Sequence, residues 1–469
     1  MQDAAQVRNE ARPISSGLAI RAAFPATLIM GAALLVAPWF GHFDDTDAQL
    51  YQVVVRKMAH SGAFLDPRYL EHLYPHFREH LPFGLWPFAL ATIASSERAA
   101  PAVAALFSLT TLVGVAAVGT RLFGRWPAIA ATLVLATSDT FFRYGGAVRL
   151  DPALMLLSNA AAVPALLGWT SRTAWLGASG LAATAMLVKP PFGLIPFIAA
   201  AGSSAVFERS WRPVLRGMLG ALLACIPLVA FLLLDRLAIH GGWWDGYLRN
   251  QVLASAFGNR PDGSTEWWFP LATIAGRFWP GMALVGVAVF LRDRRIRNLC
   301  LFCALMVLML CLPSRKVWNH ALVAYPGLAV LGGAAVVPAA AWLDRRRRYI
   351  SAALVAASVG VWIAAPLIGR AVDGRSCIGA EEFAEPLARL APGQQVLVVS
   401  SPTSWRMIAS LAAERGLEPD PRAELPDGGN SQSSFALVQE ELVGRTRGWE
   451  EVARARGWLL LRPHEGTIR

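Results

Sequence analysis

Long apolar runs alternate with short polar loops along most of this chain, from residue 22 to residue 369. Each run is about 17 to 25 residues long, which is the length an α-helix needs to cross about 30 Å of hydrocarbon. The first run ends near residue 40, where an acidic stretch follows it directly. The later spans are expected at about 100–121, 126–142, 152–169, 174–188, 192–207, 215–236, 268–291, 298–312, 321–342 and 349–369. The pattern therefore predicts an all-α bundle of about eleven membrane-spanning helices.

Residues 81–97, "LPFGLWPFALATIASSE", form an apolar segment that we do not count as a span. Counting it would move every later arginine cluster to the other side of the membrane. Trp86, Phe83 and two prolines also suit a helix that lies along the interface. We therefore place this segment, as an interfacial helix, in a first outer loop at residues 41–99.

The loops between the runs carry clusters of arginine, which indicate the orientation of the chain. The clusters are Arg8, Arg12 and Arg21; Arg121 and Arg125; Arg172; Arg209, Arg212 and Arg216; "RDRRIR" at 292–297; and "DRRRR" at 344–348. Positive loops face the cytoplasm, so the amino terminus is expected inside and the carboxyl-terminal residues outside. The amino-terminal run lacks a small-residue cleavage site, so it is interpreted as a retained signal anchor.

Composition agrees with a membrane protein. The chain of 469 residues is 55% hydrophobic and 16% charged, with a mean hydropathy of +0.43. The formal charge of +11 resides largely in the short loops, which argues against nucleic acid as a partner. Four of the five cysteines lie inside apolar runs and Cys377 stands alone, so no disulfide framework is expected.

Residues 371–469 predict a second, soluble domain, and residues 1–370 the membrane domain. Strand patterns occur in "QQVLVVSS", "SFALVQEEL" and "GWLLLRP", and "SWRMIASLAAERG" predicts a helix that ends at a glycine. These elements suit a small α/β domain of about 90 residues outside the membrane. It carries no recognisable nucleophile motif, phosphate loop or metal cluster, so we assign it acceptor binding or a lid over the membrane site.

Ionisable residues gather on the predicted outer face. The three lysines of the chain, Lys57, Lys189 and Lys316, all fall there, whereas the cytoplasmic loops use arginine. Such cations, together with Arg149 and Arg249, can hold a phosphate through charge-assisted hydrogen bonds. A nearby carboxylate can act as a general base on an acceptor. These residue types suit the transfer of a group away from a lipid phosphate.

Several motifs resemble the C-type (GT-C) superfamily of polytopic glycosyltransferases, which use polyprenyl-phosphate sugars. The resemblance is strongest to the bacterial branch with the lipid A aminoarabinose transferase and the protein O-mannosyltransferases. "DAQLYQVVVRKM" keeps an Asp, a Tyr, a basic residue and a Met at the family's spacing, which places the catalytic aspartate on Asp47 and the tyrosine on Tyr51. "FREHLPFGLW" keeps Glu79, Pro82 and Trp86 of the next motif.

Three later motifs extend the resemblance in order along the membrane domain. "RLDPALMLL" supplies Asp151, "LVKPPFG" supplies Lys189, and "SRKVWNHALVAYPGLAVL" supplies Lys316, with His320 where tyrosine is common. The chain also departs from the family. Ala48 replaces the second acid of the first motif, His80 and Leu81 replace a Lys-Pro pair, and Pro190 replaces a glycine. These departures bear on headgroup contacts and on the identity of the sugar.

The resemblance implies a glycosyltransferase of the bacterial inner membrane that attaches a sugar to an extracytoplasmic acceptor. The donor would be an undecaprenyl- or decaprenyl-phosphate sugar, and the acceptor lipid A, another glycan or a protein. Asp47 and Asp151 would be catalytic. The residues expected at the donor phosphate or substrate are Lys189, Lys316, Arg149, Tyr51, Glu79, His80, His320 and Arg249. A transporter or flippase of a lipid-linked or anionic solute is the alternative, although its charges would lie near the bilayer midplane.

Each site residue also has a simpler interpretation. Asp47 and Asp151 can cap helices, and Lys189 can extend from a helix end toward water. His72, His76 and His80 recur every fourth residue near Glu71 and Glu79, which is a spacing that metal ligands use on one helical face. Pro75 and Pro82 would disturb that helix. A divalent metal ion at Glu79, as in some relatives, is the one cofactor we consider.

Overall fold

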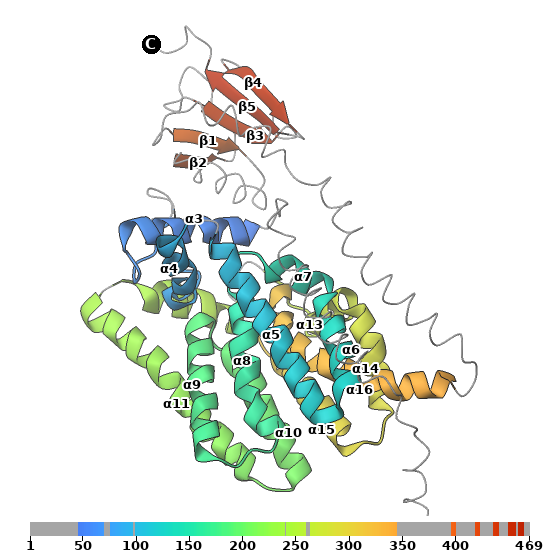
Figure 1. The fold of residues 1–469 in the computed structure, drawn as a ribbon. Helices are drawn as coiled ribbons and strands as arrows, with labels where there is room; N and C mark the ends of the chain where they lie inside the picture. Colours follow the sequence, from blue (N-terminus) through green and yellow to red (C-terminus); the bar gives the residue numbers. More distant parts are fainter. Residues whose placement is uncertain are drawn as a thin grey trace, which may run out of the picture.

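The computed structural model describes residues 46–69, 76–96, 99–239, 241–258 and 263–344, and five strands between residues 395 and 463. The first part of the chain is helical and the last forms a small sheet (Figure 1). The predicted spans at residues 22–40 and 349–369, and the predicted helix after residue 403, lie outside the described residues.

Helices occupy each predicted span within the described range. They are α5 (Ala99–Phe123), α6 (Arg125–Ala136), α7 (Asp139–Gly145), α8 (Asp151–Leu166), α9 (Arg172–Val188), α10 (Ile195–Glu208), α11 (Arg212–Leu234), α13 (Phe269–Arg277), α14 (Trp279–Val289), α15 (Arg294–Cys311) and α16 (Tyr325–Asp344). The remaining helices are α3 (Thr46–Ser61), α4 (Trp86–Ala94) and α12 (Ala254–Phe257). Short 3-10 or π-helical turns stand at Pro82–Gly84, Phe192–Leu194, Asp235–Ile239, Trp244–Leu253 and Trp318–Ala324.

Three helical segments of the described part are long and apolar enough to cross a membrane. They are Ala99–Phe123, Arg212–Ile239 and Trp318–Val336, and a bent pair, Phe269–Arg277 with Gly281–Val289, brings the number to four if it is one span. Apolar but shorter helices lie at Arg125–Ala136, Asp151–Leu166 and Phe192–Glu208. The helical, apolar architecture that the pattern predicts is thus present.

Two predicted spans are broken. The segment at 268–291 bends by 112° between α13 and α14, because Pro280, in the first turn of α14, has no N–H to continue the hydrogen bonds of α13. The segment at 126–142 breaks between α6 and α7. There the Thr137 hydroxyl donates to the Leu133 carbonyl at 2.7 Å and the Ser138 hydroxyl to the Leu135 carbonyl at 2.9 Å, so side chains compete with the backbone for acceptors.

The segment at residues 81–97 contains α4, which has 9 residues. At 1.5 Å per residue it is about 13 Å long, which is too short to cross the hydrocarbon. Helix α3 lies across one end of the bundle, with α4 beside it (Figure 1). This end of the bundle holds the candidate site described below.

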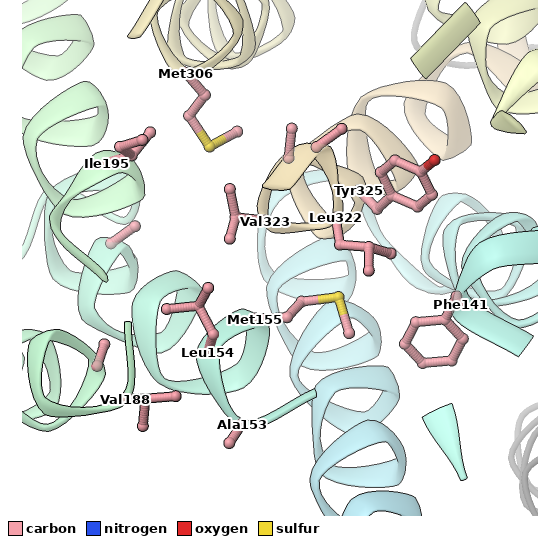
Figure 2. Close-up of a cluster of buried hydrophobic side chains, with 14 of the residues drawn as sticks. Phe141, Ala153, Leu154, Met155, Val188, Ile195, Met306, Leu322, Val323 and Tyr325 are labelled. Carbon is pink, nitrogen blue, oxygen red and sulfur yellow. The ribbon is translucent and has the colours of Figure 1, made fainter. Parts of the chain in front are cut away.

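Small and aliphatic side chains fill the core between the helices. Figure 2 shows Leu154 and Met155 of α8 facing Val323 and Leu322, with Met306 of α15 and Ile195 of α10 at the same cluster. Glycines let helices approach closely where no side chain fits. A Cβ on Gly333 of α16 would stand 2.4 Å from the carbonyl oxygen of Pro127 and 2.7 Å from Cβ of Ala131, both on α6.

The carboxyl-terminal sheet has the strand order β2-β1-β3-β5-β4 within the described residues. Its strands are β1 (Gln395–Val399), β2 (Glu418–Arg422), β3 (Phe435–Gln439), β4 (Trp449–Ala455) and β5 (Trp458–Pro463). The pairs β1–β2 and β1–β3 are parallel, and β3–β5 and β4–β5 are antiparallel. The three predicted strands are β1, β3 and β5. The two that sequence patterns missed, β2 and β4, are the edges of the described sheet.

The close packing of α6 against α16 gives a first prediction. Gly333→Ala should lower the free energy of unfolding by about 1–3 kcal/mol, because the added methyl group meets backbone that cannot move freely. Gly114→Ala in α5 is the matched control, since its Cβ meets nothing within 4 Å. Tryptophan fluorescence during thermal unfolding in detergent would measure both. Equal unfolding temperatures for the two variants would contradict the packing described here.

Candidate active site

The residues of the candidate site come from the ends of three helices, α3, α8 and α9. Asp47 lies in the first turn of α3, Asp151 is the first residue of α8, and Lys189 follows the last residue of α9. A short connection at residues 167–171 joins α8 to α9, so the two helices run antiparallel and the start of one lies beside the end of the other. Arg149 stands in the turn just before α8.

Arg149 connects the two aspartates. Its Nη2 lies 3.0 Å from Oδ2 of Asp47, and its Nε lies 2.9 Å from Oδ2 of Asp151. The Nζ of Lys189 lies 3.3 Å from the other oxygen of Asp151. Two carboxylates and two cations therefore form one continuous ion-pair network, drawn from four separate positions in the sequence.

Burial differs sharply between the two carboxylates. The side chain of Asp151 is 4% exposed, and those of Arg149 and Lys189 are 1% and 6% exposed, whereas Asp47 is 40% exposed. A buried charge is tolerated when ion pairs and hydrogen bonds replace its lost hydration. Asp151 is thus enclosed between two cations, while Asp47 keeps an edge open to a ligand.

Tyr51 packs under the network, one helical turn after Asp47. Its ring meets the His80 ring edge-on at 5.5 Å between centroids and the Phe77 ring at 6.1 Å. Burial, and next the negative charge of Asp47, raise the pKa of the Tyr51 phenol well above its ordinary value, although Arg149 opposes them. The phenol therefore stays protonated, as a neutral group that can donate a hydrogen bond. Glu79 is also among its electrostatic neighbours.

A second group of polar contacts holds the loop that carries Glu79 and His80. Arg78 forms an ion pair with Asp66, and its Nε donates to the carbonyl of Gly241 at 2.7 Å. The Nδ1 of His76 lies 2.9 Å from the same Asp66 carboxylate. Burial acts to raise the pKa of Asp66, but hydrogen bonds from Arg78 and His76 outweigh it and hold the pKa below its ordinary value. Asp66, His76 and Arg78 are thereby linked to one another, and Arg78 is linked to the loop after α11.

The remaining predicted residues lie at different distances from this network. His320 is an electrostatic neighbour of Asp151, and its ring lies 3.9 Å from that of Phe192. Lys316 is buried, and its Nζ contacts the carbonyl of Thr265 at 3.4 Å. Arg249 is 75% exposed and lies 3.9 Å from Asp245. Among the described residues, no hydrogen bond or ion pair joins Lys316 or Arg249 to the Asp47 network.

Sequence reasoning missed the aromatic support of Arg149. Its guanidinium carbon lies 4.3 Å from the centroid of the Tyr144 ring, and the Trp318 ring lies 5.1 Å from Tyr144. Arginine above an aromatic face gains a cation–π attraction. The spacing of five residues in "YGGAVR" gave a usable signal, because a turn with two glycines can fold the arginine back over the tyrosine.

No metal centre is formed by the residues that the structure describes. They contain no group of three or more His, Cys, Asp and Glu side chains that could hold an ion. His72 and Glu71, two members of the predicted histidine pattern, lie outside this part of the chain. His76 contacts Asp66, and the His80 ring meets the Tyr51 ring edge-on. The described residues therefore give no geometric support to the hypothesis of a metal ion at Glu79.

Comparisons with solved structures find the same fold in membrane enzymes. ArnT from Cupriavidus metallidurans bound to undecaprenyl phosphate has a TM-score of 0.72 at 15% sequence identity, over 97% of this chain and 100% of that chain. Its apo state has a TM-score of 0.69 at 16% identity, over 94% and 97%. The apo oligosaccharyltransferase of Archaeoglobus fulgidus has a TM-score of 0.52 at 13% identity, over 89% and 69%. A search of curated proteins finds no match.

The fold of this chain is the fold of multi-pass membrane glycosyltransferases of the C type. Residues 79–234 match the model of the family described as dolichyl-phosphate-mannose-protein mannosyltransferase. The matched segment includes Arg149, Asp151 and Lys189, and begins at Glu79. The predicted resemblance to this class is thereby confirmed.

The buried position of Arg149 gives a second prediction. Arg149→Met should lower the free energy of unfolding by about 3–5 kcal/mol, because two carboxylates lose a shared partner and one of them is enclosed. Arg249→Met is the matched control, with the same charge change at an exposed ion pair that contributes about 0–1 kcal/mol. Chemical denaturation in detergent would measure both. A loss for Arg149→Met no larger than for Arg249→Met would mean that the network contributes little to stability.

Proposed function

We propose that this protein transfers a sugar from a polyprenyl-phosphate donor to an acceptor on the extracytoplasmic side of the membrane. The observation that carries the proposal is the arrangement of Asp47, a half-exposed carboxylate held in place by a buried arginine at one end of an apolar bundle. The class of the fold supports it. A general base and a set of cations are the two components that such a transfer needs.

Asp47 is the proposed general base. It accepts the proton of the acceptor nucleophile as that atom bonds to C1 of the sugar. The bond from C1 to the phosphate oxygen breaks on the opposite face, so the configuration at C1 inverts and polyprenyl phosphate leaves with the bonding electrons. Arg149 orients Asp47, because its Nη2 donates a hydrogen bond to one carboxylate oxygen of Asp47 at 3.0 Å.

Asp151 has a positioning role in this scheme. It is enclosed between Arg149 and Lys189, so it fixes both cations and is not open to an acceptor. The Nε and Nη2 of Arg149 are engaged by the carboxylates, whereas the Lys189 ammonium has three donors and gives one to Asp151. We therefore assign phosphate contact first to Lys189, with Lys316 and Arg249 as further candidates. Tyr51, Glu79, His80 and His320 surround the same site.

The donor is proposed by analogy with the similar fold of ArnT, whose solved structure holds undecaprenyl phosphate. A bacterial undecaprenyl- or decaprenyl-linked sugar is accordingly our proposed substrate. The acceptor can be a lipid, a glycan or a protein. The transporter alternative loses its support, because the ionisable network lies at an end of α8 and α9 and not midway along them.

Topology completes the proposal. We propose about eleven crossings in residues 1–370, with α4 at the outer interface, the amino terminus in the cytoplasm and residues 371–469 outside, in a bacterial inner membrane. The carboxyl-terminal domain then shares a compartment with Asp47. We propose that this domain binds the acceptor or forms a lid over the site.

The chemical step gives a third prediction. Asp47→Asn should leave a folded protein whose turnover falls by about a hundredfold or more, because the amide keeps the shape but accepts no proton. Mass spectrometry of envelope lipids and glycans from a deletion strain would first identify the missing modification, and the purified variants would then be assayed for it. Asp245→Asn, at a carboxylate that is 72% exposed, is the control and should retain normal turnover. Near-normal transfer by Asp47→Asn would remove this residue from the mechanism.

The orientation gives a fourth prediction. In a chain without native cysteines, a cysteine at Ser61, which is exposed at the end of α3, and one at Gly428 should both react with an impermeant thiol reagent in intact cells. A cysteine at Arg295 should react only after lysis. Protection of position 61 together with labelling of position 428 would place Asp47 and the carboxyl-terminal domain on opposite sides, and the proposed topology would then be wrong.

A further inference from the structure

The end of the bundle opposite Asp47 contains a cavity of about 340 Å³. It lies between the last turns of α5, α8 and α10 and the first turns of α15, where Arg121, Leu166, Phe207 and Arg295 are among its lining residues. Helix α8 connects the two ends, since it begins at Asp151 and ends at Leu166. Its 16 residues span about 24 Å. This cavity is therefore separate from the candidate active site.

Positive charge predominates around the cavity. Arg121, Arg294, Arg295 and Glu208 line it, which leaves an excess of two positive charges. Arg295 donates through Nη1 to the carbonyl of Leu122 at 2.8 Å, and Arg294 donates to the carbonyl of Phe207. These bonds hold two guanidinium groups at the ends of α5 and α10. Each guanidinium has five N–H donors, so most of them remain for a ligand.

The cavity also presents acceptors for a hydrogen-bond donor. The Oδ1 of Asn298 is buried and has no hydrogen-bond partner among the described residues. A buried acceptor without a partner costs about 1–3 kcal/mol, which a ligand hydroxyl would recover. Glu208 offers a second acceptor at the same cavity. A ligand that combines a phosphate with hydroxyl groups would match both the arginines and these acceptors.

The surroundings place this cavity at a membrane surface. Leu122, Leu166 and Phe207 give it an apolar side. Trp126 at the start of α6, Trp169 after α8 and Trp211 before α11 stand at the same end of the helices, and they are 43%, 43% and 78% exposed. Exposed tryptophans at one level of a helical bundle are typical of the interface between hydrocarbon and water.

We propose that this cavity binds the headgroup of an anionic phospholipid in the leaflet opposite the candidate active site. The phosphate lies between Arg121, Arg294 and Arg295, and the headgroup hydroxyls donate to Asn298 and Glu208. The glycerol and the first part of the acyl chains lie against the leucines. Basic pockets between membrane helices bind such headgroups in this way. Phosphatidylglycerol has the required phosphate, hydroxyls and net negative charge.

Native mass spectrometry of the full-length protein with phosphatidylglycerol tests the proposal. Arg121→Gln should weaken binding about fivefold, and Arg121→Gln with Arg294→Gln about thirtyfold. The factors multiply because each lost charge removes a similar amount of binding free energy. Arg172→Gln is the matched control, because it removes one exposed arginine at the same end that does not line the cavity. Equal binding by Arg121→Gln and Arg172→Gln would overturn the proposal. Arg121 forms no ion pair within the described residues, so this variant should fold.

Two further ligands distinguish the sources of the phosphate. Phosphatidylethanolamine, which has no net charge, should bind at least about fivefold more weakly than phosphatidylglycerol. Inorganic phosphate at the same concentration should not raise the unfolding temperature. Stabilisation by inorganic phosphate that equals the effect of the lipid and disappears in Arg121→Gln would identify a soluble anion site and overturn the lipid assignment. None of these measurements depends on sugar transfer.

Discussion

A single buried arginine holds the candidate site together. Arg149 pairs with Asp151, which is enclosed, and with Asp47, which is half-exposed, and the aromatic ring of Tyr144 supports it from below. Without that cation, two carboxylates would stand near each other in an apolar environment, where like charges raise the free energy of both. This contact also links the first turn of α3 to the start of α8.

The two ends of the bundle differ in the cations that they use. Lys57 and Lys189 belong to the end with Asp47, whereas arginines surround the opposite end, where Arg294 and Arg295 bond to carbonyl groups at helix ends. This difference has a physical basis. Arginine has a planar set of donors that suits several fixed carbonyl groups and phosphates, whereas a lysine ammonium is a compact charge that can reorient. The end with Asp47 has both kinds of cation, since Arg149 lies there beside Lys189.

The sequence was sufficient to predict most of the helices and the acidic motifs, because hydropathy and motif spacing are local properties. Helices occur at every predicted span within the described residues, and Asp47, Asp151 and Lys189 come together. The break at Pro280 was not predicted, since apolar residues continue on both sides of it and hydropathy does not register a missing N–H. The role of Arg149 as the shared partner of Asp47 and Asp151 could not be predicted from the sequence either. Its partner Asp47 is 102 residues away, and its charge alone suggested contact with a phosphate.

The carboxyl-terminal sheet shows what local patterns omit and why. Strand β2 contains Pro419 and Pro421, and β4 begins with Trp449, Glu450 and Glu451, so neither has the alternation of apolar residues that identifies a strand. Both strands lie at edges of the described sheet. Proline cannot donate a hydrogen bond to a further strand, and closely spaced charges repel one. The residues that made these strands hard to recognise therefore also protect the sheet against adding strands from other copies of the chain, and so against aggregation.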